Sequence, residues 1–253
     1  MRSLLAALLL LGVSSGFARA QTLRAARQFY VPVLIYHHIK ALKPADNATE
    51  RGLTILPSQF RAQLQYLQSH RYHSVSAAVL VAALLGKGRL PPKPVVLTFD
   101  DGYRDMYANV YPLLRRLKMA ATFFVVPGFL GTARYLTWTQ VEEMSRHGMD
   151  IEAHTMTHPD LTLVPAAQAR DEVARSRQLL QSRLHKSVRV FAYPYGDYNA
   201  AVLRDVKAAG YRAAFTTRQG WIESSAGMLT LSRVYANHDE TVPVTPALVH
   251  PYP

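Results

Sequence analysis

Apolar, strand-like runs alternate with helical segments along most of this chain, and that alternation limits the fold more than any other feature of the sequence. The run PVVLTF at 94–99 is typical of a strand buried in a parallel sheet. Comparable runs recur, most of them separated from the next by a segment with helical spacing. The expected strands cover residues 31–39, 94–99, 120–126, 149–154, 188–193, 211–217 and 228–234.

Helices are expected between these strands. Ser58 and Ser76 are candidate N-caps of the first two helices, whereas residues 40–56 carry Pro, Asp, Asn and Gly and predict a loop. The later helices are expected at 105–117, 139–147, 165–185 and 199–209. Strands joined by helices through short connections imply βα units around a parallel sheet, and about seven strands allow either a closed barrel or an open sheet.

The first twenty residues have the pattern of a secretory signal peptide. Arg2 supplies the positive start, residues 4–13 form an apolar run too short to span a membrane, and residues 18–20 form a small-x-small cleavage site. The expected boundaries are a signal peptide at 1–20, a leader segment at 21–30, one domain at 31–241 and a Pro-rich tail at 242–253. Export to the periplasm or the extracellular space is expected, with no transmembrane segment in the mature chain.

Charge and cysteine content exclude several classes of protein. The 29 Lys and Arg against 17 Asp and Glu give a formal net charge of +12, which becomes +10 once Arg2 and Arg19 leave with the signal peptide. Basic charge suggests a nucleic-acid partner, but an exported protein rarely meets nucleic acid, so an anionic envelope polymer is the better interpretation. The chain has no cysteine, which excludes disulfides, Cys-ligated zinc, iron–sulfur clusters and thiol catalysis.

Polar side chains gather at the predicted carboxyl ends of strands, where parallel α/β folds place functional groups. Asp100 and Asp101 directly follow the strand at 94–99, His154 ends the strand at 149–154, and His158 comes four residues later. Two imidazoles and one carboxylate form a ligand set that leaves coordination positions open. This pattern predicts a divalent metal site for which zinc is the best fit, with nickel, cobalt and iron as alternatives.

Two adjacent carboxylates in one site are expected to take different roles, because their environments separate their pKa values. One of them binds the metal, and the other accepts a proton from the attacking water. The residues alone leave open which aspartate does which. The combination of a metal site with a free carboxylate indicates a hydrolase.

Three motifs extend this interpretation. TFDDG (98–102), HTMTH (154–158) and AYPYG (192–196) resemble, in order and spacing, the motifs of polysaccharide deacetylases of the NodB-like group, carbohydrate esterase family 4. The resemblance covers nearly the whole mature chain, up to LSRV (231–234). It implies an α/β fold, a deformed (β/α)7-type barrel in a single domain, and N-deacetylation of a polysaccharide.

The same resemblance implies roles for individual residues. It assigns the metal to Asp101, His154 and His158, and it makes Asp100 the general base that activates water. The backbone N–H of Tyr195 would help to hold the oxyanion.

Two departures from the family pattern concern the base and the acid. Phe191–Tyr193 replaces the arginine that pairs with the base, and Leu231–Arg233 replaces the segment that supplies a general-acid histidine. The resemblance to biofilm poly-N-acetylglucosamine deacetylases, which share both departures, implies His37 as the acid. His38 competes, because alternation along a strand directs only one of the two inward. Arg233 is a hypothesis for the side chain that replaces the missing arginine.

Substrate contacts are expected from Tyr193 and Pro194 in the third motif, from Trp221 as an aromatic platform, and from Arg233. The expected reaction removes acetyl groups from N-acetylglucosamine polysaccharide, preferably poly-β-1,6-N-acetylglucosamine, and the expected enzyme is a monomer. Peptidoglycan and chitin oligosaccharides are alternative substrates. The rival class is a carbohydrate-binding protein that has lost catalysis on the same fold.

Overall fold

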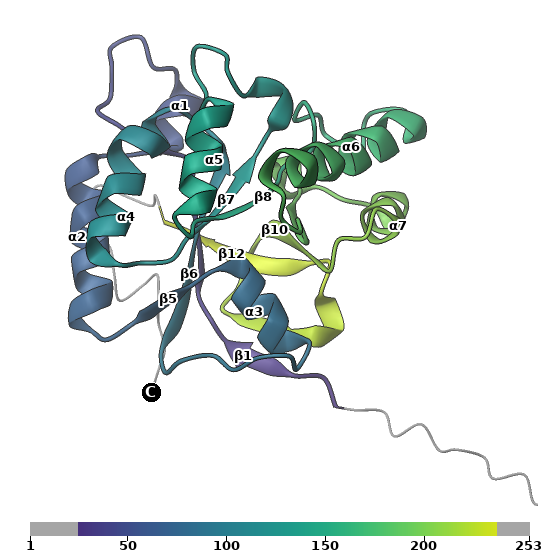
Figure 1. The fold of residues 1–253 in the computed structure, drawn as a ribbon, viewed down its shortest axis with the longest axis horizontal. Helices are drawn as coiled ribbons and strands as arrows, with labels where there is room; N and C mark the ends of the chain where they lie inside the picture. Colours follow the sequence, from purple (N-terminus) through teal and green to yellow (C-terminus); the bar gives the residue numbers. More distant parts are fainter. Residues whose placement is uncertain (1–24, 237–253) are drawn as a thin grey trace, which may run out of the picture.

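Seven parallel strands close into a barrel at the centre of the molecule (Figure 1). The computed structural model describes residues 25–236, so the predicted signal peptide and the Pro-rich tail lie outside the described residues. Around the barrel the strands are β2 (Val33–Tyr36), β12 (Leu231–Tyr235), β10 (Ala213–Gln219), β9 (Val190–Ala192), β8 (Asp150–Ala153), β7 (Thr122–Val125) and β6 (Pro94–Asp101). Strand β6 also pairs with β2, which closes the ring. The seven expected strands and the deformed barrel are therefore confirmed.

Helices surround the barrel (Figure 1). The α-helices are α1 (Ala48–Gly52), α2 (Pro57–Ser69), α3 (Ala77–Leu84), α4 (Tyr111–Leu117), α5 (Trp138–Arg146), α6 (Ala166–Leu184) and α7 (Ala200–Ala208). A π-helical turn, η1 (Met106–Val110), leads into α4, and short 3-10 turns are η2 (Pro127–Phe129), η3 (Pro194–Gly196) and η4 (Ser225–Gly227). Among residues 25–236, no helix has the length and apolar character needed to cross a membrane.

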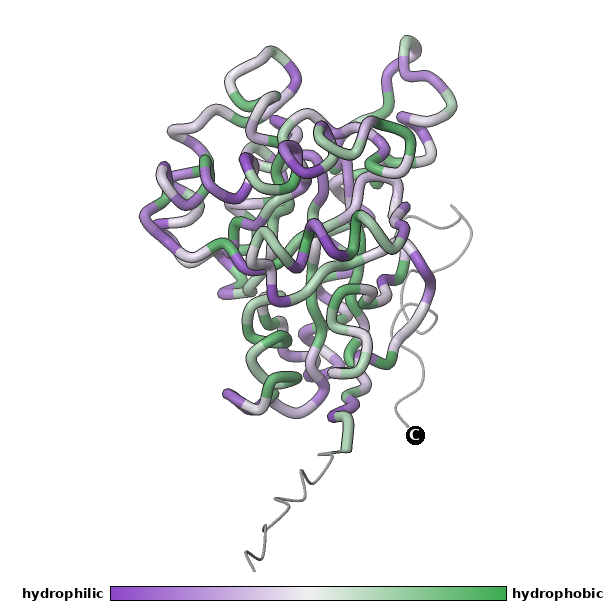
Figure 2. The backbone as a smooth tube through the Cα atoms, turned by 90° about the vertical axis from the view of Figure 1, so that its right-hand side faces the viewer, coloured by the Kyte–Doolittle hydropathy of each residue, from purple (hydrophilic) through white to green (hydrophobic). Residues whose placement is uncertain are grey.

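Side chains along each strand point alternately into and out of the barrel, so the hydrophobic core forms two clusters. Val96 and Phe124 belong to the cluster inside the barrel, whereas Leu97 and Phe99 belong to the cluster between the barrel and its helices. Figure 2 shows these hydrophobic stretches running through the middle of the molecule. Because side chains on one strand alternate between the two faces, Asp100 points into the barrel like Val96, and Phe99 points out.

Several short elements depart from the sequence-based expectation. The expected strand 31–39 is interrupted at His37, which lies between β2 and β3 (His38–Ile39). The expected loop 40–56 contains α1 and also β4 (Thr54–Ile55), which pairs with β3. Strands of two or three residues have no periodicity from which they could be predicted.

Three more short strands were also missed. Strand β5 (His73–Val75) pairs with the first half of β6. Strand β1 (Gln28–Tyr30) ends the predicted leader segment and pairs antiparallel with β11 (Ile222–Ser224), just outside the barrel. The last barrel strand begins at Leu231 rather than at residue 228, because η4 and a turn precede it.

Candidate active site

The three predicted metal ligands meet beyond the carboxyl ends of β6 and β8. Asp101 Oδ1 lies 3.4 Å from His154 Nε2 and 3.3 Å from His158 Nε2, and the two imidazole nitrogens are 3.2 Å apart. Two ligands of one tetrahedral zinc ion, each at 2.0–2.1 Å, stand about 3.3 Å from each other. Asp101 Oδ1 is buried and has no hydrogen-bond partner among the described residues. The three side chains therefore fit a single divalent ion.

The tautomer of His154 suits metal binding. Its Nδ1 lies 2.8 Å from the carbonyl oxygen of Ala192; because a carbonyl only accepts, Nδ1 must donate, and in the neutral ring Nε2 then carries the lone pair that faces the other ligands. Burial and the neighbouring His154 lower the pKa of His158 to about 4. His158 is therefore neutral at neutral pH, which is the form that binds a metal.

Backbone strain is concentrated at this site. Asp101, Thr155 and His158 have φ angles of 73°, 61° and 59°. This left-handed region costs a non-glycine residue about 1–3 kcal/mol and persists only where the surroundings hold it. These conformations turn the Asp101 carboxylate and the His158 ring toward one point.

Asp100 lies inside the barrel and pairs with Arg233. Arg233 Nη1 donates to Asp100 Oδ1 at 2.7 Å, and Arg233 Nε donates to the carbonyl of Thr216 at 2.9 Å. Burial acts to raise the pKa of Asp100, but the charges of Arg233, His154 and His37 together with the hydrogen bond from Arg233 outweigh burial, so the pKa lies below its ordinary value. Asp100 is thus a carboxylate at neutral pH.

The position of Arg233 fits one expectation and corrects another. It stands beside Asp100, as the hypothesis of a replacement arginine requires. It is 0% exposed, however, so it offers no surface to a polysaccharide and the expectation that it binds substrate is wrong.

The two adjacent histidines have different surroundings. Burial lowers the pKa of His37, whereas the negative charges of Asp100 and Asp101 act to raise it, so His37 lies in the electric field of both carboxylates. His38 instead has its Nδ1 3.0 Å from Asp105 Oδ1 and stacks on Tyr103. Of these two histidines, His37 is the one near the aspartate pair.

The third motif contributes one exposed residue to the site. Tyr195 in η3 is 62% exposed, and the edge of its ring packs against His158 at a centroid distance of 4.9 Å. Tyr193 and Pro194 are both buried, and the Tyr193 hydroxyl donates to the carbonyl of Leu229. The expectation that Tyr193 and Pro194 bind substrate is therefore wrong, because their side chains fill the core.

Trp221 is not brought to the metal ligands. Its carbonyl accepts from the N–H of Val31, just before β2 begins, whereas His37 follows the end of β2. Val31 and His37 are six residues apart, about 20 Å in an extended chain, so the backbone of Trp221 lies away from His37. Its ring is half-buried against the outer core, and its expected role as a sugar platform stays a prediction.

Two residues beside the site were missed from the sequence. Burial and the charge of Asp101 raise the pKa of Tyr103, which directly follows the first motif. Glu172 on α6 accepts hydrogen bonds from the segment between the two motif histidines. The position of Tyr103 after DDG was a usable signal, but Glu172 lies in a helix without any motif.

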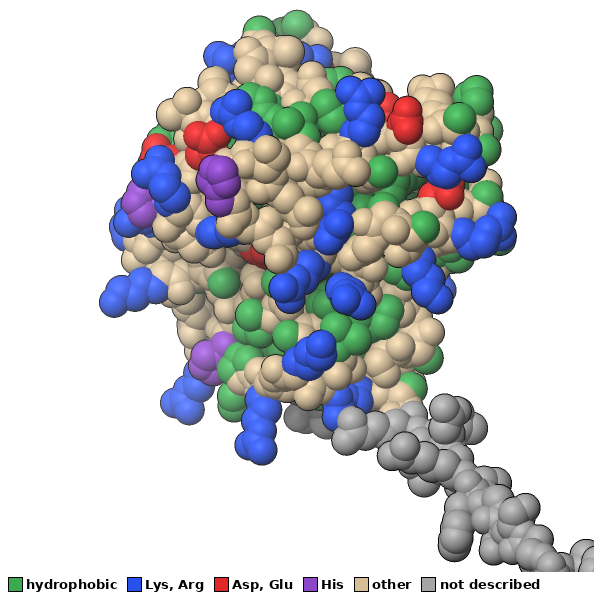
Figure 3. Space-filling model, turned by 45° about the vertical axis from the view of Figure 1, so that its right-hand side comes forward, with side chains coloured by type: hydrophobic (Ala, Val, Ile, Leu, Met, Phe, Trp, Pro, Cys, Tyr) green, Lys and Arg blue, Asp and Glu red, His purple; other side chains and the backbone are tan. Residues whose placement is uncertain are grey.

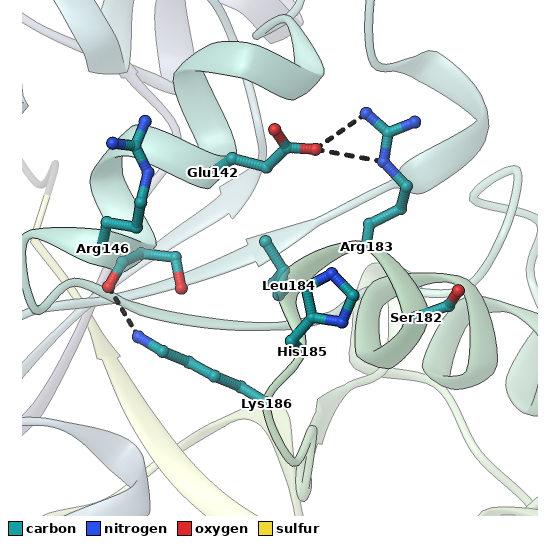
Figure 4. A pocket seen from close by; sticks show the side chains of 8 residues that line it. Glu142, Arg146, Ser182, Arg183, Leu184, His185 and Lys186 are labelled. Atoms are coloured by element: carbon teal, nitrogen blue, oxygen red, sulfur yellow. Dashed lines mark hydrogen bonds and ion pairs between the residues drawn. The ribbon is translucent and has the colours of Figure 1, made fainter.

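Away from the predicted metal ligands, a polar pocket lies between the carboxyl-terminal ends of α5 and α6 (Figure 4). Glu142 pairs with Arg183 at 2.7 Å, and Lys186 donates to the carbonyl of Ser145. These two contacts connect α5 with the end of α6. The residues that line the pocket include none of the predicted metal ligands and not the predicted base, Asp100.

Carboxylates and imidazoles gather at the carboxyl ends of the barrel strands, where βα barrels place their active sites. The family model described as polysaccharide deacetylase matches residues 87–214. The Bacillus subtilis (strain 168) protein YxkH, which is named as a polysaccharide deacetylase, is 31% identical over 204 residues, covering 81% of this chain and 70% of its own. The chain belongs to the polysaccharide deacetylase family, whose members are hydrolases that cleave carbon–nitrogen bonds.

Two further relatives agree with this family. The Streptococcus pyogenes deacetylase PplD, solved in complex with acetate, superposes with a TM-score of 0.76 at 32% identity, covering 83% of this chain and 93% of that chain. The poly-β-1,6-N-acetyl-D-glucosamine N-deacetylase of Staphylococcus aureus (strain MRSA252) is 26% identical over 203 residues, covering 75% of this chain and 70% of its own.

Proposed function

We propose that this protein is a metal-dependent N-deacetylase that acts on N-acetylglucosamine polysaccharide, with poly-β-1,6-N-acetylglucosamine as the preferred substrate. One observation carries the proposal: the donor atoms of Asp101, His154 and His158 surround one point, and a separate carboxylate, Asp100, is kept ionised beside them. The substrate preference rests on the sequence resemblance and on the name of the staphylococcal relative.

Each residue has a defined part in the proposed reaction. Asp101, His154 and His158 would hold a divalent ion, which would supply a Lewis acid for the acetyl carbonyl and lower the pKa of water. Asp100 accepts the proton of water as the water oxygen bonds to the acetyl carbon. The backbone N–H of Tyr195 donates to the oxygen that becomes negatively charged.

The second half of the reaction breaks the carbon–nitrogen bond. His37 gives a proton to the nitrogen as the bond breaks, so the products are acetate and a free amine on the sugar. Proton exchange with solvent restores Asp100 and His37. The assignment to His37 is supported by the influence of both aspartate charges on its pKa, whereas His38 is paired with Asp105.

We further propose that the enzyme works outside the cytoplasm, on the strength of the signal-peptide pattern at 1–20. A polysaccharide of the cell envelope or biofilm is the substrate expected there. The product carries free amines, so the reaction also makes the polymer cationic.

A panel of defined oligomers tests the substrate. Acetate release should be fastest with β-1,6-linked N-acetylglucosamine oligomers and slower with chitin oligomers and peptidoglycan fragments. Faster acetate release from chitin oligomers or from peptidoglycan fragments would show that this other polymer is the preferred substrate. Sugar binding without acetate release from any of them, with metal-loaded protein, would favour the rival class of a carbohydrate-binding protein.

A further inference from the structure

The turn between the two motif histidines is strained at both ends. Thr155 and His158 have positive φ, and Met156 and Thr157 lie between them. Each residue with positive φ costs about 1–3 kcal/mol of folding free energy, so this turn needs hydrogen bonds that hold it in place. One partner is internal, because Thr155 Oγ1 accepts from the N–H of His158 at 2.9 Å.

Glu172 on α6 holds the middle of the turn. Its Oε2 accepts from the N–H groups of Met156 and Thr157 at 2.8 and 2.7 Å, and its Oε1 accepts from the Thr157 hydroxyl at 2.6 Å. Glu172 is 7% exposed. Hydrogen bonds to an ionised group are about twice as strong as neutral ones, and three of them connect this one side chain to two adjacent residues.

The opposite side of the turn is held by η2. The N–H of Gly128 donates to the carbonyl of Met156 at 2.9 Å. A Cβ at this glycine would lie 2.5 Å from the same carbonyl oxygen, so only glycine allows this approach. Met156 is therefore fixed through its N–H by Glu172 and through its carbonyl by Gly128.

We propose that Glu172 is a positioning residue of the metal site. By holding the turn, it keeps the Nε2 atoms of His154 and His158 at the 3.2 Å separation that one ion requires. It acts through Met156 and Thr157, and its contacts are with the turn rather than with the donor atoms. This inference rests on the proposed function, because it takes the three residues near Asp101 to be metal ligands.

The competing explanation is that Glu172 only attaches α6 to the barrel. Removing such an attachment would lower the free energy of unfolding but leave the metal affinity of the folded protein unchanged. A positioning residue must affect both. Metal affinity and the ligand-field spectrum are therefore the informative readouts.

The experiment measures zinc affinity of the full chain by competition with a chromophoric chelator, together with the visible absorption of the Co²⁺-loaded protein. Glu172→Ala should weaken zinc binding about 10–100-fold, as loss of a residue that orients metal ligands does, and should alter the Co²⁺ spectrum. Glu172→Gln should retain affinity close to that of the wild type, because its carbonyl oxygen still accepts from both N–H groups.

Glu152 provides a matched control. It is a buried carboxyl group on β8 that also accepts from two N–H groups, those of Arg189 and Val190, at 2.8 Å each. These partners lie at the start of β9 and not in the turn. Glu152→Ala should lower stability without changing zinc affinity or the Co²⁺ spectrum.

The outcomes separate the two proposals. If wild-type protein binds no zinc, the proposed function fails. If it binds zinc and Glu172→Ala binds equally well with an unchanged spectrum, the role of Glu172 is only structural. Should Glu172→Ala not fold, Glu172→Asp serves instead: its shorter side chain cannot reach all three donors, so it should bind zinc more weakly than Glu172→Gln. Equal affinity of these two variants would overturn the inference.

Discussion

Asp100 and Asp101 are neighbours in the sequence but meet different surroundings. Asp100 follows the alternation of β6 and points into the barrel toward Arg233. Asp101 has a φ of 73°, which turns its carboxylate toward the two imidazoles. One change in backbone conformation thus separates a carboxylate suited to accept a proton from a carboxylate suited to bind a metal.

Replacing Arg233 should change the titration of Asp100. In Arg233→Met the positive charge is lost and burial remains, so the pKa of Asp100 should rise and the acid limb of the pH–rate profile should move to higher pH. Because a buried charge loses its partner, unfolding free energy should fall by about 3–5 kcal/mol. The profile of kcat/KM against pH checks this, with Arg233→Lys as the charge-retaining control. An acid limb that stays in place would contradict the pairing.

Substitution of His37 and of His38 tests which of the two adjacent histidines is the general acid. His37→Ala should lower kcat about 10²–10⁴-fold, the usual contribution of a general acid, while zinc affinity stays near that of the wild type. His38→Ala removes a ring that pairs with Asp105 and should mainly reduce stability. Steady-state kinetics and thermal unfolding of both variants distinguish them. Full turnover in His37→Ala together with its loss in His38→Ala would mean that His38 is the acid.

At the scale of elements, the barrel strands could be predicted and the short additions could not. Strands such as β6 and β7 occur as apolar runs that need burial on both faces. Strands β1, β4, β5 and β11 have two or three residues each, and their pairing depends on neighbours far away in the chain. The pairing of β1 with β11 also brings a buried carboxyl group, Glu223, to the edge of the barrel.

Glu223 should make stability depend on pH. Burial raises the pKa of Glu223 from 4.5 to about 8 in the folded state. The folded protein then binds more protons than the unfolded chain between these values, so this contribution is complete below pH 4.5 and is lost as the pH rises through about 8. The loss is on the order of a few kcal/mol, because one pKa unit corresponds to about 1.4 kcal/mol.

Chemical denaturation between pH 7 and pH 9 measures this effect, above the range in which His37 and His158, with pKa values lowered in the folded state, act in the opposite direction. The wild type should lose stability as the pH rises, and Glu223→Gln should lose less, because an amide in the same position does not ionise. Desolvation also raises the pKa values of Asp150 and Glu152, which titrate in the same direction, so the slope in Glu223→Gln should be reduced rather than abolished. An unchanged slope would mean that Glu223 does not titrate in this range.

At the scale of the whole molecule, the barrel brings together residues that are far apart in the sequence. The grouping of Asp101, His154 and His158 and the place of Asp100 beside them could be predicted, because their motifs sit at strand ends and match a known family. Arg233 beside Asp100 depends on closure of the barrel between β12 and its neighbours, and Glu172 depends on how α6 packs. No local pattern encodes either contact. The basic excess of the sequence is spread over the face in Figure 3 rather than gathered at one patch.

Metal binding should stabilise the whole fold. Zinc at one hundred times its dissociation constant should raise the free energy of unfolding by about 2.7 kcal/mol, because it binds the folded state. Thermal unfolding with zinc and with chelator measures the difference. His154→Ala should show little shift, since it removes one of the three ligands. An equal shift in this variant would place the metal elsewhere.

The most direct test of the proposed function is acetate release from N-acetylglucosamine oligomers by purified protein, with zinc and after chelation. The wild type should release acetate, lose this activity with chelator and regain it when zinc is restored. Asp100→Asn should bind zinc but release no acetate, because the base is gone. Acetate release that survives chelation, or that persists in Asp100→Asn, would contradict a metal-dependent reaction with Asp100 as its base.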